Sequence, residues 1–222
     1  MEAQVIRLSL MSHLFYFTEV SGGSTSAAVT GDFLGDLALN YAIRNALGQR
    51  DYTHRKKPEY AEIADFGFYC TVARPVSHHD KTEAYIQNTL FNVDGYIDVK
   101  AIENSGKSPF KNFRQVQGIR LGSEFEALVL SEKPIALPPV IRMGRALETM
   151  VVIEKAEESR TQDFWLNAFS LKTVFNNLNI ATALMLEKDK VNFSFLLENY
   201  NLIKQMNKED VLEIFKPVFN NG

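Results

Sequence analysis

Residues 135–153, IALPPVIRMGRALETMVVI, place two apolar runs on either side of a proline pair and an Arg-x-Gly-Arg motif. Pro138 and Pro139 lack backbone donors and hold the chain extended, so no helix can run through them. Residues 150–153 are uniformly apolar, which predicts a buried strand. The stretch therefore predicts an extended segment that leads into a strand.

The centre of this stretch has the chemistry of a phosphate site. Gly144 permits a positive φ or the close approach of a ligand, and Arg142 and Arg145 flank it with planar, always-charged guanidinium groups. A glycine between two arginines, next to a buried strand, suits a nucleic-acid backbone. The alternative is a solvated loop whose arginines pair with carboxylates such as Glu148.

Upstream, two segments have clear periodicity. Residues 5–11 alternate apolar and polar side chains, which predicts a strand with one buried face. The apolar residues of 34–42 fall on one helical stripe, with Thr30 or Asp32 available to cap its start and Gly48 just past its end. A helix is therefore expected soon after the first strand.

The rest of the chain continues this mixture of strands and helices. Further strands are predicted at 66–72, 85–99 (a hairpin turning at Asp94-Gly95), 113–121, 125–130 and 191–197, and further helices at 164–175 and after Asn207. This order implies an α+β protein with a largely antiparallel sheet, for which a ferredoxin-like core is the simplest architecture. We expect a single domain over residues 1–222.

Composition narrows the class of protein. The 222 residues are 45% hydrophobic and 23% charged, which is ordinary for a globular domain. No segment approaches the roughly 18 apolar residues of a membrane span, so no membrane is expected as a partner. A secretory signal is not evident, and Cys70, the single cysteine, lies in an apolar run. These features predict a cytoplasmic protein.

The charge is unevenly distributed. The net charge is −3, yet residues 100–145 carry eight Lys and Arg against four Asp and Glu. Positive charge is thus concentrated in the block that ends at the Arg-x-Gly-Arg motif. One face for a polyanion, with other faces for protein neighbours, would produce this distribution.

Familiar catalytic motifs are absent from the sequence. It contains no Walker A, Gly-x-Gly-x-x-Gly, His-Glu-x-x-His or Gly-x-Ser-x-Gly pattern. His78 and His79 are adjacent and would point to opposite sides of an extended chain, so we predict no metal site and no cofactor. His13 and Tyr16 form a candidate acid/base pair, for which a structural or surface role is the alternative.

The segment RDYTHRKKPEY, residues 50–60, combines cations with aromatic side chains. Arg55, Lys56 and Lys57 lie between two tyrosines, so the segment could supply charge and stacking for nucleotides. A solvated loop explains the same residues, and both interpretations stay open.

Three segments together resemble one group of CRISPR proteins: TGDFLGDLALNYAI (30–43), FYCTVARPV (68–76) and NFRQVQGIRLGSEFEALVL…IALPPVIRMGRALETMVVI (112–153). The chain is similar to the RAMP-superfamily subunit of the type I-D surveillance complex, Cascade, which caps the 5′ handle of the guide RNA. The resemblance covers about residues 5–180 and is faint over about 181–222, which would form a C-terminal extension.

The resemblance implies an RNA-recognition-like ferredoxin core, a protruding β-finger and no catalysis. Such a subunit binds the crRNA 5′ handle, abuts the CRISPR backbone subunit and docks the large subunit, which reads target DNA near the protospacer-adjacent motif. It would thus act in a ribonucleoprotein complex of antiviral defence. The alternative is a metal-independent endoribonuclease that cuts the repeat RNA and uses His13 and Tyr16.

Candidate RNA-binding residues follow from the same resemblance. Arg142, Gly144 and Arg145 match the basic glycine-containing loop of the family. The tip of the β-finger is expected over residues 103–115, and the candidate RNA contacts in the region of the finger are Lys107, Lys111, Arg114 and Arg120.

Overall fold

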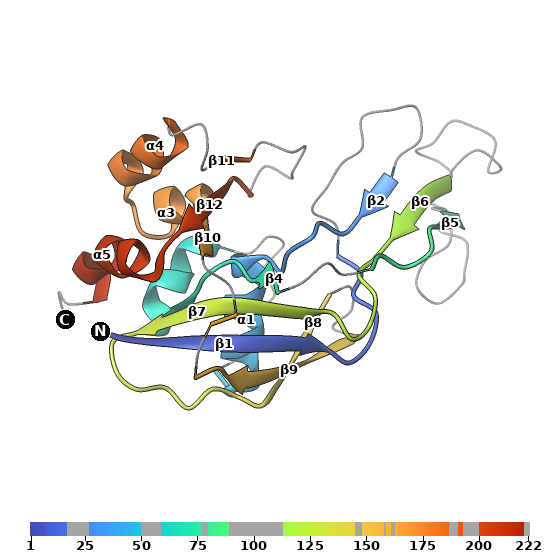
Figure 1. Ribbon diagram of the computed structural model, residues 1–222, viewed down its shortest axis with the longest axis horizontal. Helices are drawn as coiled ribbons and strands as arrows, with labels where there is room; N and C mark the ends of the chain where they lie inside the picture. Colours follow the sequence, from blue (N-terminus) through green and yellow to red (C-terminus); the bar gives the residue numbers. More distant parts are fainter. Residues whose placement is uncertain are drawn as a thin grey trace.

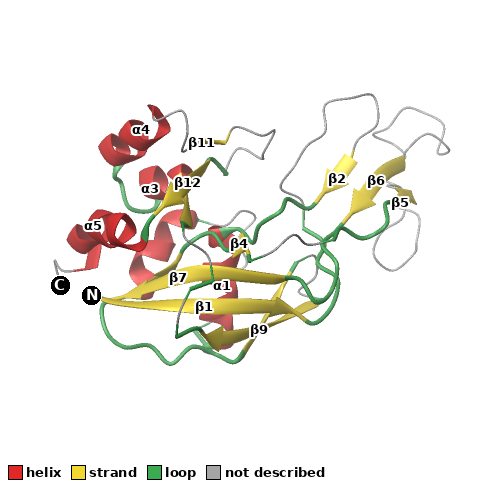
Figure 2. Ribbon diagram, viewed as in Figure 1, coloured by secondary structure: helices red, strands yellow, loops and turns green. Residues whose placement is uncertain are grey.

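The computed structural model describes residues 1–16, 27–49, 59–76, 80–88, 113–144, 148–157, 159–160, 163–186, 191–192 and 200–219. Within these ranges the protein is a mixed α/β fold built on a large antiparallel sheet, with helices packed against it (Figure 1, Figure 2). Two three-stranded sheets accompany the large one. The prediction of a largely antiparallel fold with both helices and strands is confirmed.

The large sheet consists of β1 (Glu2–Leu10), β3 (Phe68–Cys70), β4 (Arg74–Pro75), β7 (Glu124–Ser131), β8 (Val140–Met143) and β9 (Thr149–Lys155). Its order is β3-β7-β1-β9-β8, with β4 paired to β7, and all these pairings are antiparallel. Along β1 the alternation is as predicted, because Leu8 and Leu10 are buried while Arg7 and Ser9 are less so. The first face of the sheet, which carries Leu8 and Leu10, is therefore buried along β1. The second face, which carries Arg7 and Ser9, is partly open there.

The stretch 135–153 forms the β8–β9 hairpin at the edge of this sheet. The proline pair precedes β8 directly, as an extended segment should. The predicted buried strand is only half right: Val151 and Ile153 are buried, but Met150 is 39% exposed. The reason is that β9 lies where the second face of the sheet is open, so only alternate residues reach the core.

Helix α1 (Asp36–Ala46) covers the first face of the sheet. Leu39 and Ile43 of the helix pack in one apolar cluster with Ile6 and Leu8 of β1. Gly48 follows the helix with φ of 76°, the left-handed conformation that favours glycine after a helix end. The predicted stripe and its end are confirmed.

The predicted start of α1 is wrong. The residue before the helix is Gly35, which provides no side-chain cap. Thr30 instead accepts a hydrogen bond from the Tyr16 amide at 3.1 Å, and Asp32 pairs with Lys81 at 2.5 Å. The capping residues that the sequence offered are used to hold neighbouring segments.

The second face is covered by the C-terminal elements and a 3₁₀ helix: η1 (Tyr60–Phe66), β10 (Phe164–Asn167), α3 (Ala168–Thr173), α4 (Leu178–Leu186), β11 (Val191–Asn192), β12 (Leu202–Met206) and α5 (Lys208–Phe219). Phe215 of α5 stacks on Tyr69 of β3, with ring centroids 5.1 Å apart. Asn207 caps α5 as predicted, since its Oδ1 accepts from the Asp210 amide at 2.7 Å. Residues beyond 181 thus complete the core of this face.

The helix predicted at residues 164–175 is in part a strand. Residues 164–167 form β10, which pairs antiparallel with β12, and α3 begins only at Ala168. Asn167 marks the change, because its side chain accepts from the Phe169 amide at 3.1 Å and caps the helix. A pairing with a strand about forty residues later overrides the local helical pattern.

One of the two three-stranded sheets contains β2 (Ala27–Val29), β5 (Tyr85–Asn88) and β6 (Phe113–Gln117). Figure 1 shows it beyond the end of β1, away from both chain termini. In it β6 pairs in parallel with β2 and antiparallel with β5. The rest of the hairpin predicted at 85–99 lies outside the described residues.

The predicted tip of the β-finger, 103–115, falls mostly outside the described residues too. Its last three residues belong to β6, so at that end the chain is a strand. The strand predicted at 113–121 ends at Gln117, and the one predicted at 125–130 is β7. None of the helices in the described ranges is long and apolar enough to cross a membrane.

Candidate nucleic-acid interface

Gly144 follows β8 and has φ of 79°, so the backbone here is left-handed. A Cβ atom at this position would lie 2.9 Å from Leu14 Cδ1 and 3.2 Å from the Phe15 carbonyl oxygen. Glycine is therefore required both by the backbone conformation and by the neighbouring chain. The close approach that the sequence suggested is made by residues 14 and 15.

Arg142 lies two residues earlier, directly across from Met150 in the β8–β9 register. Its side chain is exposed, and it forms no ion pair within the part of the chain that the structure describes. The alternative pairing with Glu148 is thus not made by Arg142. Arg145 lies outside the described residues.

Residues 13–15 run between the β8–β9 hairpin and two further segments. Leu14 and Ile119 exchange backbone hydrogen bonds of 2.9 Å, and Lys81 forms a bridge to the other side of Ile119. The Leu121 amide donates to His13 Nδ1 at 3.1 Å. Three segments distant in sequence are in this way held side by side, next to Gly144.

This arrangement brings Arg120 to the same end of the sheet as Arg142. Arg120 is 62% exposed, and its nearest carboxylate, Asp80, is 3.9 Å away. We call the end formed by His13, Arg120, Arg142 and Gly144 the basic pole. Its two arginines are available to a phosphate, because surface ion pairs as long as that of Arg120 contribute little.

A cavity of about 250 Å³ opens at the basic pole and is lined by His13, Lys81, Thr82, Glu83 and Arg120. The sequence analysis singled out His13 and Arg120 but not the other three. Lys81 is neutralised within the protein, since it pairs with Asp32 and donates to the Thr30 carbonyl. No periodicity marks residues 81–83, and only their bridge to Ile119 places them here.

His13 and Tyr16 are held by different partners. The Tyr16 hydroxyl donates to the Phe33 carbonyl and accepts from the Gly35 amide at 3.1 Å, so it supports the start of α1. The His13 ring accepts at Nδ1, so in its neutral form Nε2 carries the hydrogen. This geometry gives the tyrosine a structural role.

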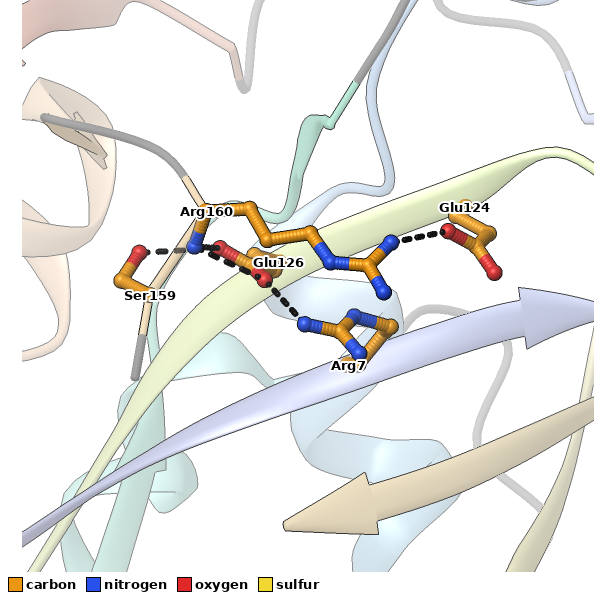
Figure 3. Close-up of polar contacts among 5 residues, drawn as sticks. All are labelled: Arg7, Glu124, Glu126, Ser159 and Arg160. Carbon is orange, nitrogen blue, oxygen red and sulfur yellow. Dashed lines mark hydrogen bonds and ion pairs between the residues drawn. The ribbon is translucent and has the colours of Figure 1, made fainter. Parts of the chain in front are cut away.

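The open face of the large sheet carries charged pairs on its two central strands (Figure 3). Glu126 of β7 accepts from Arg7 of β1 at 3.0 Å, from the Ser159 hydroxyl at 2.8 Å and from the Arg160 amide at 2.9 Å. Arg160 also reaches Glu124 at 3.1 Å. Residues 159–160 are thus held against this face of β7.

The remaining site candidates are not placed. Arg114 belongs to β6, and nothing is established about its side chain. No metal-binding group of His, Cys, Asp and Glu occurs among the described residues. Outside the described residues lie Arg55, Lys56, Lys57, His78, His79, Lys107, Lys111 and Arg145.

Comparison with known proteins identifies the chain. The family model described as type I-D CRISPR-associated protein Cas5/Csc1 matches residues 1–217. The protein is therefore a CRISPR effector-complex subunit. More specifically, it belongs to the type I-D Cas5/Csc1 family, which confirms the resemblance found in the sequence.

A chain of the type III-B Cmr-beta cryo-EM structure, bound to cognate target RNA and AMPPnP, is similar with a TM-score of 0.42 and 7% identity. The similarity covers 96% of this chain and 88% of that chain. The comparison with curated proteins gave no match.

Proposed function

We propose that the protein binds the 5′ handle of the crRNA at the basic pole and acts as a non-catalytic subunit of type I-D Cascade. The observation that carries the proposal is the position of Arg120 and Arg142, both exposed, at one end of the sheet beside residues 13–15. Among the described residues Arg142 forms no ion pair, and Arg120 forms one with the exposed Asp80 at 3.9 Å. Planar guanidinium groups are suited to backbone phosphates. Membership in the Cas5/Csc1 family makes guide RNA the proposed polyanion.

The fold of the core supports the same proposal. Four strands of the large sheet lie in the order β9-β1-β7-β3, and α1 connects β1 to β3. A ferredoxin-like core has this order, so we assign that architecture here. We assign the base of the β-finger to β5 and β6, which project beyond the large sheet (Figure 1).

The proposed partners follow from the proposed role. The crRNA handle would occupy the basic pole, and the backbone and large subunits of the complex would contact other faces. Target DNA near the protospacer-adjacent motif would meet the protein through the large subunit. A net charge of −3 fits one basic pole on a protein whose remaining surface contacts proteins.

The RNA-binding proposal predicts a change in salt dependence when Arg142 is replaced. Arg142→Ala should weaken binding of a repeat-derived RNA handle and lower the slope of log affinity against log salt by about one unit. Adding Arg145→Ala should lower the slope by about two units in total. The measurement is a titration of labelled RNA at several salt concentrations.

Lys133 provides a matched control, because it is an exposed cation at the opposite end of the sheet, just after β7. Lys133→Ala should leave both affinity and slope unchanged. Unchanged RNA binding by the double arginine variant would exclude the basic pole as the handle site.

A second test addresses catalysis. Cleavage of RNA without a metal needs a base for the ribose 2′-hydroxyl and an acid for the leaving oxygen. Tyr16 is engaged with the backbone at the start of α1, which favours a non-catalytic role. We expect intact repeat RNA after incubation with the purified protein, on a denaturing gel beside a 2′-deoxy control. Cleavage that His13→Ala abolishes would establish the endoribonuclease instead.

A further inference from the structure

The backbone of Arg120 is held at the basic pole by the segment that precedes β5. Residues 80–82 lie along residues 118–120 and are joined to them by two backbone hydrogen bonds of 3.0 Å. One of these bonds runs from the Arg120 amide to the Asp80 carbonyl. The position of the Arg120 guanidinium therefore depends on where residues 80–82 are held.

Lys81, in the middle of this segment, ties it to the chain that leads into α1. Its Nζ pairs with Asp32 Oδ1 at 2.5 Å and donates to the Thr30 carbonyl. Thr30 is itself fully buried, and its hydroxyl oxygen accepts from the Tyr16 amide at 3.1 Å. The ammonium group of Lys81 thus reaches a fixed point of the core.

A direct contact between Lys81 and a phosphate is the alternative role, because Lys81 lines the cavity at the basic pole. The side chain of Lys81 is only 23% exposed, however, whereas that of Arg120 is 62% exposed. Its charge is also compensated by Asp32, which interacts in addition with Lys204 of β12. To bind a phosphate, the ammonium group would have to give up the carboxylate that it already holds.

We infer that Lys81 is a positioning residue of the basic pole, which makes no contact with RNA and holds Arg120 in place for a phosphate by anchoring residues 80–82 to Thr30 and Asp32. A guanidinium whose backbone is already fixed loses less freedom on binding, so more of the contact appears as affinity. The inference rests on the proposed function, because it needs RNA at the basic pole.

The test is a double-mutant cycle on RNA binding. Arg120→Ala, Lys81→Met and the double variant are titrated with labelled repeat-derived handle RNA at several salt concentrations. Each single variant should bind about tenfold more weakly, and the double variant no more weakly than Arg120→Ala alone. The slope of log affinity against log salt should fall by about one unit in all three, since all lose the same phosphate contact.

A charge-balanced variant separates positioning from simple repulsion, because Lys81→Met also removes a counter-charge of Asp32. Lys81→Met with Asp32→Asn keeps the net charge of the wild type but lacks the anchor, so it should bind as weakly as Lys81→Met. Thermal melting checks that the variants are folded. Should Lys81→Met fail to fold, Asp32→Asn alone replaces it. Weaker RNA binding by Asp32→Asn, despite its added positive charge, supports the inference, and tighter binding overturns it.

Arg44→Met is the matched control. Arg44 lies in the last turn of α1, its side chain is 22% exposed, and it pairs with Glu62 at 3.6 Å. Loss of this ion pair should leave RNA binding unchanged. Lys81→Arg should restore most of the affinity, because arginine can still pair with Asp32.

The outcomes separate the inference from the proposed function. If the losses of Lys81→Met and Arg120→Ala multiply in the double variant, or if the charge-balanced variant binds like the wild type, Lys81 acts through its own charge. The inference is then wrong and handle binding stands. Normal binding by Arg120→Ala also overturns the inference alone. If wild-type protein binds no handle RNA, both fail.

Discussion

Replacing Asp36 with alanine is expected to lower the free energy of unfolding by about 4 kcal/mol. Asp36 is fully buried in the first turn of α1. Its carboxylate accepts from the Tyr69 hydroxyl at 2.8 Å, from Asn167 Nδ2 at 2.9 Å and from the Ser170 hydroxyl. Alanine would leave these buried donors without an acceptor, and each such loss costs about 1–3 kcal/mol.

The measurement is urea unfolding of the purified protein, with a thermal melt beside it. For a chain of this length, 4 kcal/mol corresponds to a fall of about 10 °C in Tm. Asp65→Ala is the control, because Asp65 is an exposed carboxylate in η1. A loss below about 1 kcal/mol in Asp36→Ala would show that the network does not hold the C-terminal elements to α1.

The variant Asp36→Asn tests how the stability of the protein depends on pH. Burial raises the pKa of the Asp36 carboxyl more than the hydrogen bonds from Ser170, Asn167 and Tyr69 lower it. A raised pKa in the folded state contributes stability below the ordinary value of 3.8, and this contribution is lost as pH rises. The stability difference between wild type and Asp36→Asn should therefore narrow from pH 4 upward.

The sequence predicted the elements whose signals are local. The alternation along β1, the stripe of α1 and the Asn207 cap each depend on residues a few positions apart. Gly144 is also a local signal, because a positive φ between β8 and β9 strongly favours glycine at that position.

Distant contacts escaped prediction. Asp36 looks like an acidic residue in the first turn of a helix, yet two of its partners, Asn167 and Ser170, are 131 and 134 residues away. The helix expected over 164–175 gave way to β10 for the same reason, since β12 pairs with it. Such burial and pairing are set by tertiary structure, so they produce no periodic pattern in the local sequence.

The candidate site shows the same division. Arg142 and Gly144 were found because they lie in one short motif, and Arg120 because the family resemblance placed it in the expected region of the β-finger. Lys81, Thr82 and Glu83 were missed, because they join the site only when their segment pairs with Ile119.

Replacing Glu126 with alanine is expected to cost about 3–5 kcal/mol, the usual effect of removing one partner from a buried ion pair. The side chain of Glu126 is fully buried, and Arg7 beside it is mostly buried. Without the carboxylate, the Arg7 guanidinium would lose its counter-charge and the Ser159 hydroxyl its acceptor (Figure 3). Residues 159–160 would also lose their anchor on the open face of the sheet.

A double-mutant cycle separates the pair from simple loss of packing. Arg7→Ala with Glu126→Ala should cost clearly less than the sum of the two single variants, since neither charge is then buried alone. Glu132→Ala is the control, because Glu132 is exposed just beyond the end of the same strand. Additive costs would mean that the two side chains act independently.

The pH dependence of this pair has the opposite sign to that of Asp36. Burial raises the pKa of Glu126, but the hydrogen bonds from Ser159, Arg7 and the Arg160 amide lower it by more. The net pKa therefore lies below the ordinary value of 4.5. A carboxyl with a lowered folded pKa contributes stability above its ordinary value, and the contribution is lost as pH falls through the folded value. The difference between wild type and Glu126→Gln should thus be constant from pH 7 to about 5 and shrink below pH 4.5. A difference that stays constant down to pH 3 would show that the Arg7–Glu126 pair does not depend on the charge of the carboxylate.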